Sequence, residues 1–363
     1  MRVRVVNSDR GFQAARRQSL LEAALGASWN LPHSCKGGSC GLCKARLLAG
    51  EVHYPNGRPL GLSDAEIGAG YILLCQARAR SDLELELHEV RAAHEGGASR
   101  LPCRIERAVP VTHDVMRVLL RRPPAVDFAF KAGQYVDIVL SDDKRRSFSI
   151  ASPPHDSRLL ELHVRRVAGG EFTEWLFGNG RREDDGRDVA LQRTAVQDAL
   201  ITIEGPLGRF FYREAPPGAG PLLLIGGGTG IAPLLSILRH IIENGIEREL
   251  ILYWGARGRR DLYVDSAILE LGRRAPRMRY VPVLSEPEPG WAGRIGFVHA
   301  AVLQDFDELG GCEIYAAGPP AMIEALRSEF PRHGAAADRL YCDSFDYAQD
   351  SLERQRSSAA TKS

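Results

Sequence analysis

Four of the seven cysteines lie within one short part of the chain, and their spacing suits a metal cluster. Cys35, Cys40 and Cys43 form a C-x4-C-x2-C loop, and Cys75 follows an apolar run. Four thiolates that converge on two irons and two sulfides require a tightly curved loop, and the glycines at positions 37, 38 and 41 permit that curvature. Structural zinc sites usually pair two short C-x2-C knuckles, whereas this segment has only one. The pattern therefore indicates a [2Fe–2S] cluster.

The composition is that of an ordinary globular protein. The chain has 363 residues, of which 44% are apolar and 26% charged, with a formal net charge of +1. Such a length suggests two or three domains, and the balanced charge gives no sign of a nucleic-acid partner. No apolar run is long enough to span a bilayer, and the N-terminus lacks a signal-peptide core. We therefore expect a cytoplasmic protein that binds neither membrane nor nucleic acid.

The remaining cysteines, Cys103, Cys312 and Cys342, are scattered along the chain. They are not spaced as ligands or as a secreted disulfide scaffold, so we expect them to be small buried hydrophobic residues.

The rhythm of apolar residues divides the chain into segments. Residues 1–90 contain alternating strand-like stretches around a helix and the cysteine loop, and residues 100–217 are rich in short strands. In residues 218–345 apolar strands alternate with helix-like segments, which is typical of a parallel α/β sheet. The strand-rich segment favours an antiparallel barrel. Residues 91–99 are predicted to be a linker, and residues 346–363 a disordered tail.

The cysteine segment resembles the ferredoxin domain of plant-type ferredoxins. The likeness covers residues 31–52 together with Cys75-Gln76-Ala77. It implies a β-grasp fold for residues 1–90. It also implies that Cys35 and Cys40 hold one iron, and that Cys43 and Cys75 hold the other.

A second candidate site lies near the middle of the chain. Arg146, Phe148 and Ser149 form an R-x-F-S pattern after a turn, and Gly170 and Thr173 lie where a glycine turn leads into a helix. An arginine fork suits a pyrophosphate, an aromatic ring can pack on a flavin, and a helix start favours an anion. The alternative is a capped helix after a hairpin, without a ligand.

These motifs resemble the flavin domain of the ferredoxin–NADP reductase superfamily. The resemblance implies an antiparallel β-barrel that binds FAD. Residues 180–198 depart from the family pattern as an insertion, which leaves the adenosine end of the flavin site open.

A third candidate site begins where an apolar strand meets a glycine loop. Gly228, Thr229 and Gly230 precede a helix with Pro233 in its first turn, which suits a dinucleotide pyrophosphate. The G-T-G-I-A-P form is the one seen in the same superfamily. That resemblance places the adenosine ribose of the nicotinamide nucleotide near Arg257 and Asp261.

The end of the chain carries further parts of this resemblance. Gly318 and Pro319 follow a later strand, where the family has Cys-Gly, but Ala317 occupies the cysteine position. Phe345 falls where several relatives place an aromatic ring over the flavin, and a core phenylalanine on a final strand is an equal alternative.

Taken together, the motifs resemble the reductase components of bacterial multicomponent oxygenases and CDP-6-deoxy-delta-3,4-glucoseen reductase. The resemblance implies an electron-transfer reductase that passes electrons from NADH through FAD and the [2Fe–2S] cluster to a partner protein. That partner is expected to be an oxygenase component, or alternatively a deoxysugar dehydratase. A redox-sensing binding protein is the alternative of another class. The motifs require no catalytic acid or base, and none is assigned. NADPH is an alternative to NADH as the electron donor. We expect the protein to be a monomer.

Overall fold

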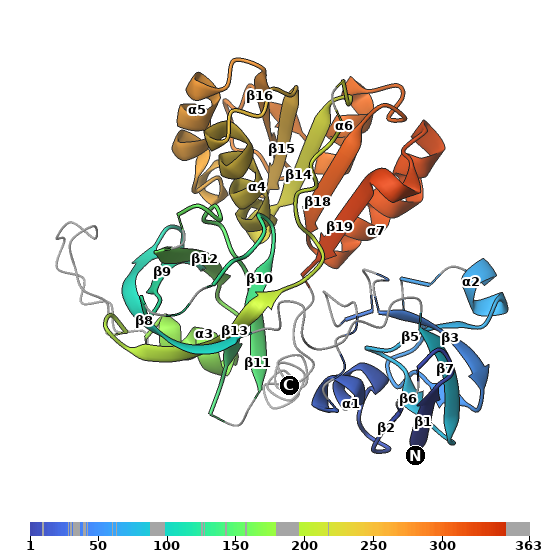
Figure 1. The fold of residues 1–363 in the computed structure, drawn as a ribbon. Coiled ribbons are helices and arrows are strands. Elements are labelled where there is room, and N and C mark those ends of the chain that lie inside the picture. Colours follow the sequence, from blue (N-terminus) through green and yellow to red (C-terminus); the bar gives the residue numbers. More distant parts are fainter. Residues whose placement is uncertain are drawn as a thin grey trace, which may run out of the picture. The chain divides into compact units, whose positions relative to one another are not determined.

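The structure is a computed structural model whose elements are shown in Figure 1. It describes the following residues: 1–8, 11–27, 29, 31, 37–38, 41, 43–59, 61–62, 64–87, 99–124, 126, 128–141, 144–156, 158–178, 196–216 and 218–345. Cys35 and Cys40 lie outside these residues, as do most of the expected linker, most of the expected insertion and the expected tail. The chain divides into two compact units, residues 1–97 and 98–363.

The first unit is built on a five-stranded mixed sheet in the order β2-β1-β7-β3-β5. Strands β1 and β7 run parallel, although β1 pairs antiparallel with β2. This arrangement with one packed helix agrees with the expected β-grasp fold. The elements are β1 (Arg2–Val5), β2 (Gly11–Gln13), α1 (Leu20–Gly26), β3 (Lys44–Ala49), β4 (Val52–His53), α2 (Asp64–Gly68), β5 (Tyr71–Leu73), β6 (Arg78–Ala79) and β7 (Leu83–Leu87).

Helix α1 begins at a capping box beside the fourth cysteine. The Ser19 hydroxyl accepts from the Glu22 N–H at 3.2 Å, and the Glu22 carboxylate accepts from the Ser19 N–H at 3.0 Å. The first helical N–H groups, of Leu20 and Leu21, donate to the carbonyl oxygens of Ala77 and Leu74. The helix start and the segment that carries Cys75 therefore hold each other in place.

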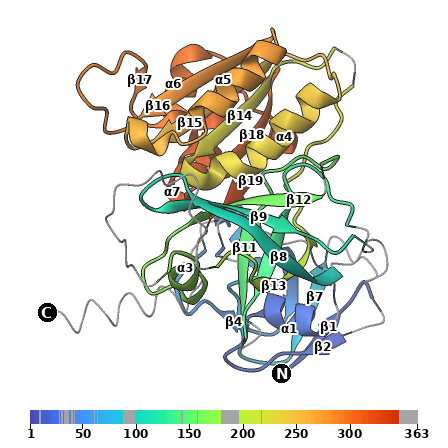
Figure 2. The same cartoon turned by 90° about the vertical axis from the view of Figure 1, so that its left-hand side faces the viewer.

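The second unit begins with a six-stranded antiparallel sheet in the order β11-β10-β13-β8-β9-β12. A bridge between Ile150 and Leu162 joins the end of β11 to β12, so the sheet closes into the expected barrel. Figure 2 shows the barrel strands below the second sheet of this unit. The elements are β8 (Ser99–Pro110), β9 (Val115–Arg121), β10 (Tyr135–Val139), β11 (Arg145–Ser149), β12 (Leu159–Arg165), α3 (Glu171–Leu176) and β13 (Leu200–Leu207).

Strands β8 and β13 were not predicted from the sequence. Pro102 and several arginines interrupt the apolar pattern of β8, yet Leu101, Cys103 and Ile105 alternate into the barrel core. Strand β8 begins at Ser99, so the last residue of the expected linker belongs to the barrel.

The rest of the second unit is the expected parallel α/β sheet, in the order β17-β16-β15-β14-β18-β19. Helices α4 and α5 contribute to the core on one face, and α6 and α7 to the core on the other. The elements are β14 (Leu222–Gly227), η1 (Gly228–Gly230), α4 (Ile231–Glu243), β15 (Leu250–Ala256), η2 (Arg259–Asp261), α5 (Asp265–Arg274), β16 (Met278–Leu284), β17 (Arg294–Ile295), α6 (Val298–Asp305), β18 (Glu313–Gly318), α7 (Pro320–Glu329), η3 (Phe330–His333), η4 (Ala337–Arg339) and β19 (Leu340–Ser344).

The strand order reverses between β14 and β18, which creates a switch point at the carboxyl ends of these strands. The glycine loop passes very close to β18 there. A Cβ atom at Gly230 would lie 1.9 Å from the carbonyl oxygen of Ala317, so only glycine fits. The glycine loop, which the sequence predicts to bind a ligand, therefore also packs directly against β18.

Within the described residues, no helix combines the length and the apolar character needed to cross a bilayer.

We predict that Gly230→Ala destabilises the second unit, because the new methyl group would collide with backbone rather than with a flexible side chain. The expected loss is at least about 2 kcal/mol. The matched control is Gly272→Ala within α5, where a Cβ would meet nothing within 4 Å. That change should stabilise by about 0.5–1 kcal/mol, since alanine is the better helix former. Thermal unfolding followed by circular dichroism measures both. Equal melting temperatures for Gly230→Ala and the wild type would contradict the packing argument.

Candidate functional site

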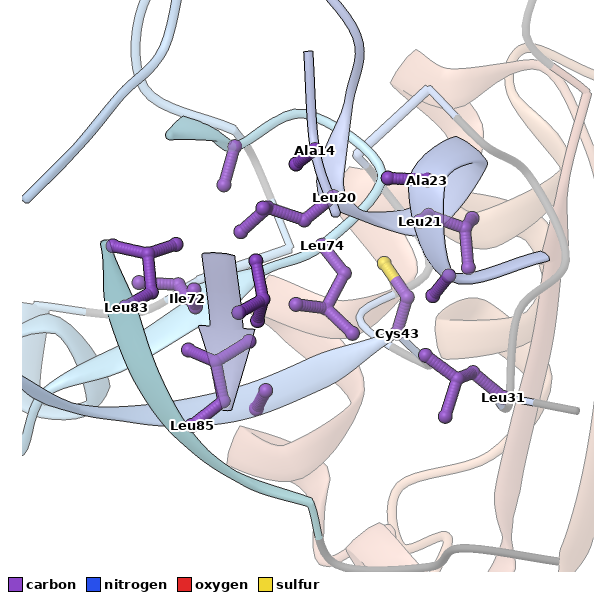
Figure 3. Packing of buried hydrophobic residues seen from close by; sticks show 14 of the residues in the cluster. Ala14, Leu20, Leu21, Ala23, Leu31, Cys43, Ile72, Leu74, Leu83 and Leu85 are labelled. Atoms are coloured by element: carbon purple, nitrogen blue, oxygen red, sulfur yellow. The ribbon is translucent and has the colours of Figure 1, made fainter. Parts of the chain in front are cut away.

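The two described cysteines of the cluster motif lie together inside the first unit. Cys43 precedes β3 and Cys75 follows β5, and the Cys75 N–H donates to the Cys43 sulfur at 3.4 Å. Both residues are buried, at 3% and 6% exposure. Figure 3 shows the Cys43 sulfur among Leu21, Leu31 and Leu74. An N–H donor and an apolar shell are features that tune an iron–sulfur site.

Two glycines of the cysteine loop, Gly38 and Gly41, have the backbone conformation that tight curvature requires. Gly38 and Gly41 have φ angles of +91° and +72°, as expected from the sequence. Gly61 was not predicted as part of this site. Its N–H donates to the Gly38 carbonyl at 2.7 Å, and a Cβ there would lie 2.8 Å from the same oxygen. The segment before α2 therefore packs directly on the cysteine loop, a contact that no local sequence signal reveals.

The three scattered cysteines are buried free thiols, as predicted. Burial raises the pKa of Cys103 to about 11, and it also raises the pKa of Cys312 and Cys342. These groups therefore stay protonated at neutral pH and are poor ligands or nucleophiles.

The R-x-F-S motif lies on β11, paired with β10. Ser149 is opposite Tyr135, and the Ser147 hydroxyl donates to the buried Asp137 carboxylate. Arg146 is half-buried, and its guanidinium donates to the carbonyl oxygen of Arg145. The strand pairing thus fixes the backbone of the motif, and Tyr135 is a neighbour that the sequence did not single out.

Phe148 begins a row of aromatic rings. Its centroid lies 5.5 Å from that of Phe172, which in turn lies 5.8 Å from Trp175 on α3. Phe172 is buried, whereas Trp175 is 43% exposed. The row ties the flavin motif to the glycine turn that precedes α3.

Gly170 and Thr173 meet in that turn. The Thr173 hydroxyl accepts from the Val167 N–H at 3.1 Å and donates toward the carbonyl oxygens of Val167 and Gly170. A Cβ at Gly170 would lie 2.7 Å from the Thr173 hydroxyl. The threonine side chain is therefore engaged in shaping the turn, which leaves the N–H groups at the start of α3 as the donors available to an anion.

The glycine loop of the third motif forms the short helix η1 at the switch point. Gly228 has a φ of +54°, Gly230 precedes α4, and Pro233 occupies the first turn of α4, as predicted. The Trp254 indole N–H donates to the Gly228 carbonyl at 3.0 Å. A buried side chain of β15 thus orients the loop.

The turn after β15 contains the residues expected near the ribose. One oxygen of the Asp261 carboxylate accepts from the Gly258 N–H at 3.1 Å, so Asp261 also holds the turn in shape. Arg257 is exposed, together with Arg259 and Arg260. The structure thus places acidic and basic groups side by side in this turn.

Gly318, Pro319 and Phe345 gather at the carboxyl ends of β18 and β19. The Phe345 N–H donates to the Gly318 carbonyl at 2.9 Å, and its ring packs partly on the core shared with α4. Ala317 is fully buried and pairs in register with Asp343, a buried residue that the sequence analysis missed. Among the described cysteines, none replaces Ala317. Cys312 precedes β18, at the opposite end of the strand, and Cys342 pairs with Ala316.

Arg165 is the clearest site residue that the sequence analysis missed. It ends β12 of the barrel, and a Cβ at Gly228 would lie 3.2 Å from its Nη1 atom. Its Nε lies 3.3 Å from the Asp114 carboxylate, as an ion pair without hydrogen-bond alignment. A guanidinium from the barrel therefore lies against the glycine loop of the parallel sheet. The only sequence signal is a basic residue at the end of a predicted strand.

Three protein-family models match the chain in succession. They describe a 2Fe-2S iron-sulfur cluster binding domain over residues 3–80, an oxidoreductase FAD-binding domain over residues 102–212, and an oxidoreductase NAD-binding domain over residues 224–328.

Known proteins resemble the chain over nearly its whole length. It is 38% identical to the reductase subunit of an aromatic O-demethylase from Amycolatopsis sp., with 90% of this chain and 94% of the relative covered. It is 35% identical to CDP-6-deoxy-L-threo-D-glycero-4-hexulose-3-dehydrase reductase from Yersinia pseudotuberculosis, with 92% and 95% covered. The crystal structure of the Amycolatopsis cytochrome P450 reductase GcoB matches with a TM-score of 0.70 and 35% identity, covering 95% of this chain and 98% of that one.

We predict that Thr173→Val weakens FAD binding, because the turn before α3 loses the hydrogen bonds of the threonine hydroxyl while the side-chain volume is kept. A net loss of about 1 kcal/mol corresponds to a roughly fivefold rise in the Kd for FAD. Thr173→Ser is the control, since it retains the hydroxyl and should bind FAD like the wild type. Titration of the deflavinated protein with FAD, followed by flavin fluorescence, gives both constants. Equal affinities for the valine and serine variants would show that the hydroxyl plays no part.

Proposed function

The chain belongs to the family of iron–sulfur flavoprotein reductases that join a plant-type ferredoxin domain to FAD-binding and NAD-binding domains, and we propose that it delivers electrons to an oxygenase component. It is an NADH-dependent flavin and iron–sulfur oxidoreductase. The proposed partner rests on the likeness, along most of the chain, to the electron transfer component of a xylene/toluene monooxygenase and to a reductase component of terephthalate 1,2-dioxygenase.

We assign the cluster to four ligands: Cys35, Cys40, Cys43 and Cys75. The contact between the Cys75 N–H and the Cys43 sulfur supports the proposal that this pair shares one iron. The positive φ angles of Gly38 and Gly41 support a loop that curves around the cluster.

We assign FAD to the barrel, with contacts from Arg146, Phe148, Ser149, Gly170 and Thr173. The half-buried guanidinium of Arg146 suits a pyrophosphate, and the ring of Phe148 offers an apolar face to the flavin. Thr173 acts indirectly, since its hydroxyl holds the Gly170 turn.

We assign the nicotinamide nucleotide to the switch point of the parallel sheet. Residues at the carboxyl ends of four neighbouring strands, β15, β14, β18 and β19, lie at this edge of the sheet, where such sheets usually bind ligands. The assigned residues are Gly228, Thr229, Gly230, Pro233, Arg257, Asp261, Gly318, Pro319 and Phe345.

We also assign Arg165 to the site of the nicotinamide nucleotide, because of its position in the structure. Its guanidinium lies against Gly228 and suits the same pyrophosphate.

We propose domain boundaries at residues 1–90, 100–217 and 218–345 for the three cofactor modules, and a monomer in the cytoplasm. The sheets of the barrel and of the α/β module fall within the second and third ranges, apart from Ser99 at the start of β8.

When bound at these sites, the nicotinamide nucleotide, FAD and the cluster would supply hydride donation, two-electron acceptance and single-electron transfer, respectively. The chain binds and orients the groups, and no side chain is required as a proton donor or acceptor. The engaged hydroxyl of Thr173 and the close packing of Gly230 serve that orientation.

A deoxysugar dehydratase is the second candidate partner, favoured by the 35% identity to the Yersinia dehydrase reductase over 92% of this chain. Stopped-flow reoxidation of the NADH-reduced protein by each purified partner distinguishes the two. If an oxygenase component is the partner, it should reoxidise the reduced protein faster than the dehydratase does. A redox sensor, the candidate of another class, would show no sustained turnover of NADH with either partner.

We predict that Cys43→Ser separates two activities. Ferricyanide can take electrons directly from the flavin, whereas cytochrome c receives them mainly through the cluster. The variant should therefore keep NADH–ferricyanide turnover and lose most cytochrome c reduction. Steady-state assays at matched flavin content measure both activities.

The control for this experiment is Cys312→Ala, which removes a buried thiol of the α/β module. It should retain both activities. If Cys43→Ser reduced cytochrome c as fast as the wild type, the path through the cluster would be wrong for this acceptor.

A further inference from the structure

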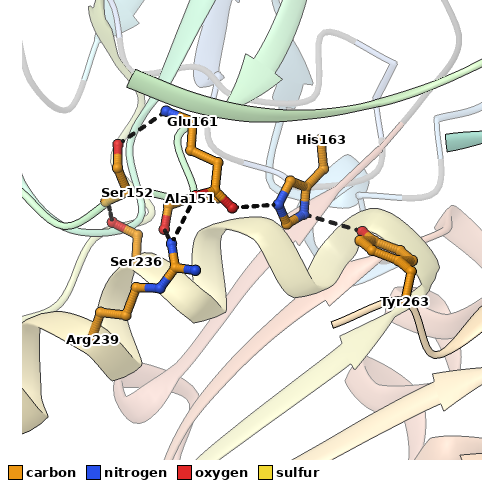
Figure 4. Close-up of polar contacts among 7 residues, drawn as sticks. All are labelled: Ala151, Ser152, Glu161, His163, Ser236, Arg239 and Tyr263. Atoms are coloured by element: carbon orange, nitrogen blue, oxygen red, sulfur yellow. Dashed lines mark hydrogen bonds and ion pairs between the residues drawn. The ribbon is translucent and has the colours of Figure 1, made fainter. Parts of the chain in front are cut away.

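The barrel and the α/β module of the second unit are joined by a partly buried polar network (Figure 4). At one end the Ser236 hydroxyl of α4 donates to the Ser152 carbonyl at 2.7 Å. In the middle, Arg239 of α4 donates to the Ala151 carbonyl at 3.0 Å and pairs with the Glu161 carboxylate at 3.2 Å. At the other end the Tyr263 hydroxyl meets His163 of β12 at 3.1 Å.

Both ring nitrogens of His163 have a hydrogen-bonding partner. Its side chain is fully buried, and Nε2 lies 2.9 Å from Glu161 Oε1. Burial opposes ionisation of Glu161, but the hydrogen bond from His163 and the charge of Arg239 outweigh it and lower its pKa to about 2. A carboxylate only accepts, so Nε2 donates to Glu161, and Nδ1 lies at hydrogen-bond distance from the Tyr263 hydroxyl. Burial also raises the pKa of Tyr263 far above its usual range, so its hydroxyl keeps the proton.

Tyr263 is linked to the glycine loop through one side chain. Its ring packs edge-on against Trp254, with centroids 5.4 Å apart. The Trp254 indole N–H donates to the Gly228 carbonyl. The residue that contacts the barrel is therefore one side chain away from the backbone proposed to hold the dinucleotide.

Strand β12 reaches the same glycine loop by a second route. His163 and Arg165 are two residues apart and lie on one face of the strand, and the Arg165 guanidinium lies against Gly228. The contacts form a closed ring, which runs from β12 through His163, Tyr263, Trp254 and Gly228 to Arg165. Two separate contacts restrict both the tilt of the glycine loop and its distance from β12. A single contact would leave the loop free to rotate about it.

The barrel side of this ring is tied to the flavin motif. Leu162, the neighbour of His163, bridges to Ile150, which follows Ser149 of the R-x-F-S motif. The position of β12 therefore sets the position of the glycine loop relative to that motif.

We propose that His163 and Tyr263 are positioning residues for hydride transfer, which hold the nicotinamide nucleotide at reacting distance from the flavin. The reaction moves a hydride from NADH to FAD, leaving NAD⁺ and the two-electron-reduced flavin. This inference rests on the proposed placement of the two cofactors at residues 146–149 and 228–230. Neither positioning residue needs to touch the reacting atoms.

The test compares two variants that each remove one hydrogen bond from the same interface. Tyr263→Phe removes the bond to His163 and keeps the aromatic contact with Trp254. Ser236→Ala removes the bond to Ser152 at the far end of the network. Anaerobic stopped-flow measurements of flavin reduction give the limiting rate and the Kd for NADH. NADH deuterated at the transferred position shows whether the slowed step is hydride transfer.

Because small misplacements of reacting groups are costly, Tyr263→Phe should lower the limiting rate about 10-fold while the Kd for NADH changes little. The isotope effect should persist or increase. Ser236→Ala should leave the limiting rate unchanged. A double variant, Tyr263→Phe with His163→Ala, should be no slower than His163→Ala alone, since the two side chains act as one contact.

Three results would overturn the inference: an unchanged limiting rate in Tyr263→Phe, an equal loss in Ser236→Ala, or an effect on the Kd alone. A wild-type flavin that NADH fails to reduce would instead overturn the proposed function. The stopped-flow measurement of the wild type reveals that outcome by itself, so it is distinguished from a failure of the inference.

Discussion

One largely buried carboxylate, that of Glu161, connects the two halves of the second unit. Its backbone carbonyl accepts from the Ala151 N–H at 2.8 Å, and its own N–H donates to the Ser152 hydroxyl, so it helps to close the barrel. Its side chain binds Arg239 of the α/β module and His163 of β12. The Glu161 and Arg239 side chains are 13% and 19% exposed, so removing one of them would leave a poorly solvated charge without its partner and should destabilise the unit. The geometry between the two proposed cofactor sites depends on this residue.

The glycine loop after β14 is also held by contacts from other parts of the second unit. Gly230 lies so close to the Ala317 carbonyl that any side chain would collide, and Gly228 lies against Arg165 of the barrel. Ala317 occupies the position where the resemblance implies a cysteine. There Ala317 pairs in register with Gly226 of β14 and with Asp343 of β19. In the proposed assignment, close packing of the backbone at this point would hold the nicotinamide nucleotide in place.

The sequence analysis predicted the features that depend on local pattern. The antiparallel barrel and the parallel sheet follow from periodicity, and the glycine loops from residues that permit tight turns, whereas the β-grasp fold of the first unit was implied by the resemblance of its cysteine segment to plant-type ferredoxins. It missed contacts between residues distant in the chain. Gly61 reaches the cysteine loop across 23 positions, from Gly38, and Arg165 reaches Gly228 from another module. Strand β8 was missed because Pro102 and its arginines hide an alternating core face.

The central claim is that electrons enter as a hydride at the flavin and leave singly through the cluster. Anaerobic titration with NADH, followed by flavin absorbance and by low-temperature electron paramagnetic resonance of the reduced cluster, tests it most directly. The flavin takes two electrons and the cluster one, so three molecules of NADH should reduce two chains, with about one reduced cluster per chain. Uptake that stops at one NADH per chain, with no signal from a reduced cluster, would contradict the account.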